Sequence, residues 1–391
     1  MARFLFVVPP LSGHVNPTLS VGRELASRGH DVAWSGLPDA VDPLLPPDAP
    51  FLPAGSPHAV GYVEELRDRS KGLRAAAAFK FLWEQVLLPL GYAMVDGVDR
   101  VVERWQPDVL IADQQTLAGG AVACRRGLPW ATSATTSAEL VDALAALPRA
   151  EQWVDDQLST FQEAIGMPPG LTSNHDLRFS EHLVLVFSTQ HLVGAERDFP
   201  ETYAFVGPSI SDRPEPDDFP WAWLDPALPH VLVSLGTVNT QAGERFFRVA
   251  AEALAGEPLQ AVFVAPPELV PAAPNFLARR RVPQLALLPQ IDAVVSHAGH
   301  NTVCETLAHG LPLVVAPIRD DQPVVADQVV QAGAGVRVKF GRVTPADLRS
   351  AVRAVLDEPG YRVAAGDVRE SFEAAGGAPA AATRLESLCA R

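Results

Sequence analysis

The segment VVSHAGHNTVCETLAHGLPLVVAPIRDDQ, residues 294–322, predicts a strand, a polar turn, a helix and a second strand in direct succession. The apolar strand Ile291–Val295 precedes the polar run Ser296–Thr302, and the helix that follows ends at Gly310. The first backbone N–H groups of a helix lack intrahelical partners and lie at the positive end of its dipole, so they favour anions. The segment therefore predicts a phosphate site where this helix begins.

The second strand of the segment, Leu313–Pro317, leads directly into Asp320, Asp321 and Gln322. Ligands of open α/β sheets bind outside the carboxyl ends of the strands, which is where these three side chains are expected. Carboxylate and amide groups suit sugar hydroxyls and suit phosphate poorly. A diphosphate site beside a hydroxyl-binding pair indicates a nucleotide sugar as the ligand.

The stretch SHAGHNTVCETLAHGLPLVVAPIRDDQ, residues 296–322, resembles the donor-binding signature of family 1 glycosyltransferases. The resemblance implies the GT-B fold, in which two doubly wound, Rossmann-like α/β domains face each other across a cleft. It assigns the diphosphate to His297, Gly299, Asn301 and Thr302, the ribose to Glu305, and the transferred sugar to Asp321 and Gln322. His300 stands where the plant enzymes have Trp.

Two further segments resemble donor-binding parts of the same family. Ser234, Gly236 and Thr237 resemble a loop that meets the donor phosphates, although an ordinary turn between a strand and a helix has the same composition. Val282 and Gln284 resemble the segment that faces the nucleotide base and imply uracil or thymine. The alternative for this second segment is a loop entering a strand at Pro283.

His14 follows the first predicted strand, in the sequence Gly13-His-Val-Asn-Pro17, and is the candidate general base. An imidazole titrates near neutral pH and can take the proton of an attacking hydroxyl. The family's catalytic His lies in a Gly-His-x-x-Pro loop, which this sequence matches. Asp113, at the end of another strand of the same domain, is the candidate partner of the second ring nitrogen, although a helix cap is an equal alternative.

The 391 residues exceed the usual size of one domain, and two strand–turn–helix units, starting near residues 3 and 230, open the two halves alike. The Pro- and Asp-rich segment 211–230 is typical of a domain linker. We therefore expect an acceptor-binding domain over residues 1–215, a donor-binding domain over 216–370, and a helical tail over 371–391 that packs back on the first domain. An aromatic-rich helix is expected over 79–98, with its aromatic side chains in the core rather than in an acceptor pocket.

The formal net charge of −15 argues against a surface for nucleic acid or anionic membrane. The 3 Cys residues lack metal-ligand spacing, and the sequence contains no Asp-x-Asp, HExxH, CxxC or P-loop pattern, so we expect neither a metal nor another cofactor. No apolar stretch is long enough to span a bilayer or to form a signal segment. We expect a cytoplasmic monomer or homodimer.

These inferences converge on an inverting, metal-independent transferase that moves a sugar from a UDP- or TDP-sugar to a hydroxyl of a small lipophilic acceptor, as in natural-product tailoring. Two alternatives remain open. A nucleotide-sugar 2-epimerase shares the GT-B fold and also binds a UDP-sugar, and a non-catalytic helper protein can retain the fold without activity.

Overall fold

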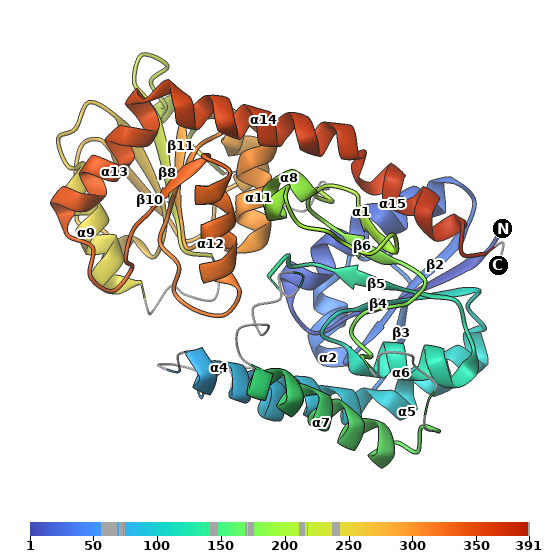
Figure 1. The fold of residues 1–391 in the computed structure, drawn as a ribbon. Coiled ribbons are helices and arrows are strands. Elements are labelled where there is room, and N and C mark those ends of the chain that lie inside the picture. The colour runs from blue at the N-terminus through green and yellow to red at the C-terminus, as the bar shows by residue number, and fades with distance from the viewer. Residues whose placement is uncertain are drawn as a thin grey trace. The chain divides into compact units, whose positions relative to one another are not determined.

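The computed structural model describes residues 1–55, 69, 73, 75–138, 140, 148–168, 170, 176–210, 216, 218–236 and 243–389. The chain forms two compact units. Unit 1 comprises Met1–Phe187, Asp198–Ser211 and Ala375–Arg391, and unit 2 comprises Ser188–Arg197 and Asp212–Ala374. Each unit is built on its own parallel sheet, which confirms the prediction of two doubly wound α/β domains (Figure 1).

Unit 1 contains a seven-stranded sheet in the order β3-β2-β1-β4-β5-β6-β7, with every neighbouring pair parallel. The strands are β1 (Arg3–Val7), β2 (Asp31–Gly36), β3 (Phe51–Pro53), β4 (Val109–Asp113), β5 (Trp130–Ala134), β6 (Val184–Val186) and β7 (Tyr203–Phe205). The central strands are almost entirely buried, because a parallel sheet is covered by helices on both faces. This burial explains the apolar runs Phe4–Val7 of β1 and Val109–Ala112 of β4, whereas β5 also contains Thr132 and Ser133.

The helices of unit 1 cover both faces of this sheet. They are α1 (Ser12–Ser27), α2 (Pro38–Val41), α4 (Ala75–Phe81), α5 (Leu88–Trp105), α6 (Leu117–Arg126), α7 (Pro148–Ala164) and α15 (Gly377–Glu386). Val15 of α1 and Leu385 of α15 share a core with Phe4, whereas Met94 of α5 and Val122 of α6 pack on the opposite face. The alternation along β1 assigns Phe4 to one core and Leu5 to the other.

The expected aromatic-rich helix is present, but a π-helical segment, Leu82–Leu87, joins α4 to α5. Trp83 lies in this segment and is buried against α7, whereas Tyr92 is 44% exposed. Phe79 and Phe81 are half-buried. The prediction of a core role therefore holds for Trp83 and is wrong for Tyr92, whose ring packs against Phe161 of α7 but remains largely exposed.

Helix α1 begins at Ser12, so His14 lies in its first turn and not in a loop after β1. The sequence LSGHVNP looked like a loop because it combines Gly and Pro with polar residues. Pro17 lies inside α1, in its second turn, so its missing N–H leaves the helix one backbone hydrogen bond short, but the helix continues to Ser27. The helical start directs the first turn of α1 to the carboxyl edge of the sheet.

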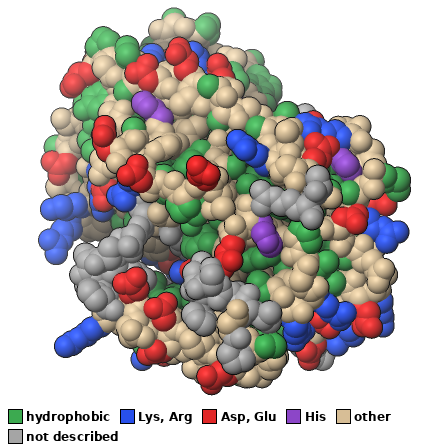
Figure 2. All heavy atoms as spheres, turned by 45° about the vertical axis from the view of Figure 1, so that its right-hand side comes forward, with side chains coloured by type: hydrophobic (Ala, Val, Ile, Leu, Met, Phe, Trp, Pro, Cys, Tyr) green, Lys and Arg blue, Asp and Glu red, His purple; other side chains and the backbone are tan. Residues whose placement is uncertain are grey.

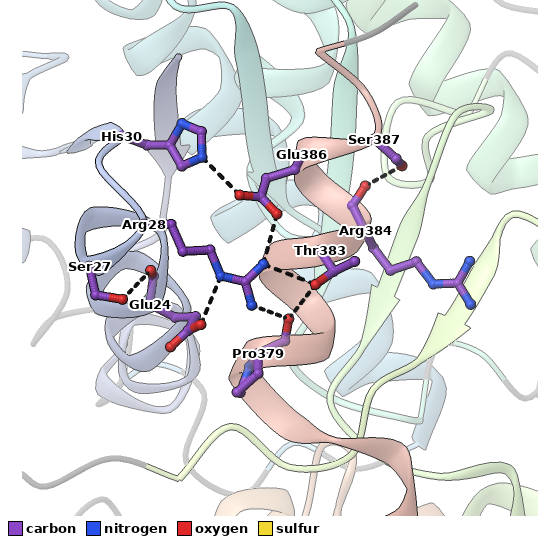
Figure 3. Close-up of polar contacts among 9 residues, drawn as sticks. All are labelled: Glu24, Ser27, Arg28, His30, Pro379, Thr383, Arg384, Glu386 and Ser387. Atoms are coloured by element: carbon purple, nitrogen blue, oxygen red, sulfur yellow. Dashed lines mark hydrogen bonds and ion pairs between the residues drawn. The ribbon is translucent and has the colours of Figure 1, made fainter. Parts of the chain in front are cut away.

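Helix α15 is bound to α1 by a polar cluster at its exposed side (Figure 3). The guanidinium of Arg28 donates to Glu24, to Glu386 and to the hydroxyl of Thr383. His30 Nδ1 accepts from the Ala2 backbone N–H, so its Nε2–H donates to Glu386 at 2.9 Å. Below these contacts Leu385 and Leu388 are buried in the core of unit 1, so the C-terminal helix belongs to this unit.

Unit 2 contains a six-stranded parallel sheet in the order β10-β9-β8-β11-β12-β13. The strands are β8 (His230–Ser234), β9 (Gln260–Val264), β10 (Phe276–Arg279), β11 (Ala293–Ser296), β12 (Leu313–Val315) and β13 (Gly335–Arg337). The helices are α8 (Gln190–Gly194), α9 (Glu244–Leu254), α10 (Gln284–Leu287), α11 (His300–Ala308), α12 (Gln322–Gln331), α13 (Pro345–Asp357) and α14 (Pro359–Ala375). Helices α9 and α13 lie side by side on one face, and α11 and α12 cover the other (Figure 1).

Across the part of the chain that the structure describes, no helix combines the length and the apolar character needed to cross a membrane. On the face drawn in Figure 2, acidic and basic side chains are interspersed among apolar and neutral atoms.

Candidate functional site

In unit 1 the candidate catalytic residues meet at the carboxyl edge of the sheet. Strand β4 lies between β1 and β5, and Asp113, its last residue, is in register with Ser133 of β5. The chain leaves β1 at Val7 and enters α1 at Ser12, which places His14 above the same edge. Because β1 and β4 are neighbours in the sheet, this topology brings His14, which follows β1, close to Asp113, which ends β4.

His14 and Asp113 form a hydrogen-bonded pair. The Nδ1 atom of His14 lies 3.0 Å from Oδ1 and 3.0 Å from Oδ2 of Asp113. The side chain of Asp113 is fully buried, and that of His14 is 14% exposed. A carboxylate oxygen can only accept, so Nδ1 carries the proton in this contact and Nε2 of the neutral ring carries the lone pair. This tautomer is the one that a general base at Nε2 requires.

Thr135, which no sequence motif marks, contacts both members of the pair. Its Oγ1 lies 2.7 Å from His14 Nδ1 and donates to Asp113 Oδ2 at 2.9 Å. The backbone N–H of Gln115 donates to Asp113 Oδ1 at 2.8 Å. The available signal was the run Thr132–Ser137, in which every residue but Ala134 has a hydroxyl and which carries polar groups past Ala134, the last residue of β5.

In unit 2 the candidate donor residues follow three neighbouring strands. Ser234 of β8 and Ser296 of β11 are paired in register, and Ser296 is also paired with Val315 of β12. The segments after these strands contain Gly236, residues 297–302, and the Asp321–Gln322 pair. All three segments therefore start from one edge of the sheet. Thr237 lies outside the residues that the structure describes.

The imidazole of His297 is held between two glycines. A Cβ atom at Gly236 would lie 2.8 Å from His297 Cε1, and one at Gly299 would lie 2.6 Å from Nε2. Only glycine fits at either position, and Gly236 also has a φ of 70°, which glycine adopts without strain. Burial lowers the pKa of His297 to about 4, and a hydrogen bond to the Ser234 backbone opposes this effect. The ring is therefore neutral near pH 7.

Nδ1 of His297 is buried and has no hydrogen-bond partner among the described residues. The next residue, Ala298, has a φ of 66° and is fully buried. A left-handed conformation costs a non-glycine residue about 1–2 kcal/mol, and such strain collects at ligand-binding turns. The strained turn leads into α11 at its N-cap Gly299, which has no side chain to cap the first N–H groups of that helix.

Helix α11 begins at His300, so Asn301 and Thr302 lie inside its first turn and not in the polar run before the helix. This difference places both side chains beside the N-terminal N–H groups, where the helix dipole favours an anion. One turn further along, Glu305 is 6% exposed and accepts a hydrogen bond from the Gln284 side-chain amide at 2.6 Å. The structure thus joins the residues expected to contact the ribose and the base.

The side chain of Val282 belongs to the core of unit 2, where it packs with Leu232 and Leu287. Any contact of Val282 with a nucleotide base would therefore use its backbone. Gln284 is the first residue of the short helix α10. Its amide reaches Glu305 from there, so Pro283 precedes a helix and not the strand that the alternative interpretation implied.

Gln322 is the first residue of α12 and is preceded by Asp321 at the N-cap. Its Oε1 accepts from the backbone N–H groups of Ile318 and Arg319, at 2.9 and 3.1 Å. Because the amide oxygen is occupied, Gln322 can offer a ligand only its Nε2–H donors, whereas the carboxylate of Asp321 can only accept. The pair therefore presents complementary groups, as a hydroxyl that both donates and accepts would require.

No group of three or more His, Cys, Asp or Glu side chains among the described residues could hold a metal ion. The thiols of Cys124 and Cys304 have raised pKa values, to about 11 for Cys124, mainly because they are buried. Neither thiol is therefore activated as a nucleophile.

Comparison with known proteins identifies the family. A family described as "UDP-glucoronosyl and UDP-glucosyl transferase" matches residues 210–367. The 4'-demethylrebeccamycin synthase of Lentzea aerocolonigenes is 32% identical over 99% of both chains. The demethyllactenocin mycarosyltransferase of Streptomyces fradiae is 27% identical over 99% of this chain and 87% of the relative.

Solved structures agree on the fold. The calicheamicin glycosyltransferase CalG4 superimposes with a TM-score of 0.81 at 24% identity, covering 100% of this chain and 99% of the other. The glycosyltransferase VinC, solved in complex with dTDP, gives a TM-score of 0.77 at 21% identity over 100% of both chains. These likenesses confirm the predicted GT-B architecture. With a relative above 30% identity along its whole length, the chain belongs to the UDP-glucuronosyl and UDP-glucosyl transferase family and is a glycosyltransferase.

Proposed function

We propose that this glycosyltransferase moves a sugar from a UDP- or TDP-sugar to a hydroxyl of a small, largely apolar acceptor, with inversion at the anomeric carbon and without a metal ion. The observation that carries the proposal is the His14–Asp113 pair, with Nδ1 3.0 Å from both carboxylate oxygens. The pair favours the tautomer that leaves the lone pair on Nε2, so His14 has the chemistry of a general base.

In the proposed reaction His14 Nε2 takes the proton of the acceptor hydroxyl as its oxygen forms a bond to the anomeric carbon. The bond from that carbon to the diphosphate oxygen breaks, and the nucleoside diphosphate leaves with the electron pair. One displacement inverts the configuration. Asp113 stabilises the imidazolium that forms. Proton transfer to a positioned general base contributes about 10² to 10⁴ in rate.

The donor would be held in unit 2. The diphosphate would accept from the first turn of α11 and from the segment His297–Thr302, and Glu305 with Gln284 would contact the nucleoside. Asp321 and Gln322 would hold the sugar hydroxyls. Leaving-group charge is then stabilised by N–H groups and the helix dipole rather than by a cation. His297 contributes as a neutral ring, because burial lowers its pKa to about 4.

The names of the relatives support a natural-product acceptor and a thymidine or uridine donor. They include glycosyltransferases for oleandomycin and zeaxanthin, and one solved relative was studied with thymidine diphosphate. We also propose that the enzyme is cytoplasmic, because the similar proteins are bacterial biosynthetic enzymes.

The test is a mass-spectrometric screen of UDP-glucose and TDP-glucose against a macrolide aglycone, a flavonol and zeaxanthin, with and without EDTA. We expect one added hexose, inverted at the anomeric carbon by NMR, and the same rate in EDTA. His14→Ala should lose turnover by about 10² to 10⁴ and keep its affinity for UDP in calorimetry. His191→Ala, at an exposed position on α8, is the control and should keep turnover.

Retained turnover in His14→Ala would remove the base from the mechanism, and loss of activity in EDTA would contradict metal independence. A changed sugar after incubation with UDP-glucose alone would instead indicate an epimerase. No affinity for UDP or TDP in the unaltered protein would indicate a non-catalytic helper.

A further inference from the structure

Thr135 lies directly after β5 and completes a three-residue cluster with His14 and Asp113. Its Oγ1 is 2.7 Å from His14 Nδ1 and 2.9 Å from Asp113 Oδ2. Thr135 is 3% exposed and Asp113 is 1% exposed, so water does not compete for these contacts. Hydrogen bonds between groups shielded in this way are stronger than those at a surface.

The single proton of the Thr135 hydroxyl is committed to Asp113 Oδ2, so the oxygen can only accept from His14 Nδ1. Nδ1 then faces three acceptors, the two carboxylate oxygens and Oγ1. A ring protonated at Nδ1 satisfies this arrangement. A neutral ring protonated at Nε2 could accept the Thr135 hydroxyl proton at Nδ1, but its lone pair would then face both carboxylate oxygens and Asp113 Oδ2 would lose its donor.

Thr135 also fixes the carboxylate itself. Oδ2 accepts from Thr135, and Oδ1 accepts from the Gln115 backbone N–H at 2.8 Å. The two donors come from the ends of neighbouring strands, β5 and β4, so the carboxylate cannot rotate without losing one of them. This restraint keeps both oxygens at 3.0 Å from Nδ1.

We propose that Thr135 is a positioning residue that holds His14 in the Nδ1–H tautomer and Asp113 in its bridging orientation, so that the catalytic unit is a His–Asp–Thr triad. The proposal rests on the proposed role of His14 as general base. Thr135 acts through His14 and Asp113 and does not itself exchange a proton with the acceptor.

The principal variant is Thr135→Val, which removes the hydroxyl and keeps the shape of the side chain. With the donor and acceptor pair of highest turnover in the screen, we expect kcat to fall about tenfold to a hundredfold, the equivalent of one hydrogen bond to a charged group. KM for the donor should not change. Thr135→Ser should restore kcat to within about threefold, because it restores the hydroxyl. Thr135→Ala carries the same expectation as Thr135→Val if the latter does not fold.

Thr132→Val is the matched control, in the strand that leads to Thr135. Thr132 Oγ1 donates to the Arg178 carbonyl and accepts from the Ser180 N–H, at 2.9 and 2.8 Å, so it makes buried hydrogen bonds away from His14. We expect this variant to be less stable but to keep kcat within about twofold, since stability alone does not alter the triad. An equal loss of kcat in Thr132→Val would show that any buried hydroxyl of β5 matters and would overturn the proposal.

Two further measurements separate this proposal from the function itself. In ¹⁵N-labelled protein without ligand, the His14 signals, assigned by comparison with His14→Gln, should show Nδ1–H in the wild type and more Nε2–H in Thr135→Val. In an Asp113→Asn background, Thr135→Val should cause no further loss of kcat, because both residues act through one imidazole.

An unchanged tautomer, full kcat in Thr135→Val, or no rescue by Ser overturns the positioning role while leaving His14 as the base. Turnover that survives in His14→Ala overturns the base itself.

Discussion

His14 and Asp113 are 99 residues apart in the sequence, yet Nδ1 of His14 lies 3.0 Å from both carboxylate oxygens of Asp113. The contact depends on strand order, because β4 pairs directly with β1 and the chain enters α1 soon after β1 ends. The carboxylate is fully buried and the imidazole is partly exposed. Asp113 is therefore shielded from solvent, whereas the imidazole of His14 remains partly accessible.

Replacing Asp113 by Asn tests this relationship. An amide at this position can donate to Nδ1, which favours the wrong tautomer, and it cannot stabilise an imidazolium. We expect kcat to fall about 10² to 10⁴ in steady-state kinetics, with the affinity for UDP unchanged in calorimetry. A kcat within threefold of the wild type would show that the carboxylate is only structural.

Gly236 and Gly299 test how tightly the His297 ring is held. Gly299 has an ordinary φ of −63°, so Gly299→Ala adds only a close contact with the ring. We expect the affinity for UDP to fall about tenfold or more, since about 1.4 kcal/mol corresponds to a factor of ten. Gly256→Ala is the control for backbone strain alone, because Gly256 has a φ of 72° and a Cβ there would meet no atom within 4 Å.

In the control variant Gly256→Ala we expect a loss of about 1 kcal/mol in the free energy of unfolding and unchanged UDP binding. Gly236→Ala combines strain with contact and should show both effects. Unchanged UDP binding in Gly299→Ala would mean that the position of the His297 ring does not matter for the donor.

The sequence predicted the sheets well because parallel strands buried on both faces are short apolar runs, as in β1, β8 and β11. It placed two helix starts too late, at α1 and α11. Neither helix has a side-chain hydrogen bond at its N-cap, which is Leu11 in one and Gly299 in the other. Without a capping residue the polar first turn resembles a loop, so the sequence alone could not locate these starts.

Only part of the site could be predicted from the sequence. A single motif gave the residues of one segment, such as His297 and Glu305, whereas contacts between distant segments left no local pattern. Thr135 lies 121 residues from His14, and its contact exists only because β5 lies beside β4. The Gln284–Glu305 hydrogen bond likewise depends on how α10 and α11 are placed by the sheet. Such pairs require the three-dimensional arrangement.

Gln322→Glu tests whether the Gln322 amide donates to the sugar. A Glu side chain can still accept from the Ile318 and Arg319 N–H groups, but it offers no donor to a ligand. We expect KM for the UDP-sugar to rise about tenfold or more while Kd for UDP, which lacks the sugar, is unchanged. Gln322→Ala, which also releases the loop, should lower stability as well. Equal weakening of UDP and UDP-sugar by Gln322→Glu would place Gln322 against the nucleotide and not the sugar.

His297 predicts a pH dependence of stability. Its pKa is lowered from an ordinary value of 6.5 to about 4, mainly by burial. Between these two values the unfolded chain binds a proton that the folded ring does not, so the free energy of unfolding falls as pH decreases from about 6.5 towards 4. We expect His297→Gln to remove this dependence, which amounts to about 3 kcal/mol at most, in denaturant titrations at several pH values. Identical pH profiles for the two proteins would contradict a buried, neutral His297.

Glu386 predicts an acid-sensitive contact between α15 and α1. Its pKa is lowered, first by the hydrogen bond from His30 and then by Arg28. The stabilisation is therefore present above the ordinary value of 4.5 and is lost as pH falls through the lower folded value. We expect Glu386→Gln to lower the free energy of unfolding by about 0.5–1 kcal/mol at pH 5, since the side chains are partly exposed, and the difference to shrink by pH 3. Arg384→Gln is the charge control, because Arg384 points away from Arg28 (Figure 3), and it should show no such change. A wild-type advantage that persists unchanged from pH 5 to pH 3 would mean that the carboxylate charge of Glu386 does not secure the C-terminal helix.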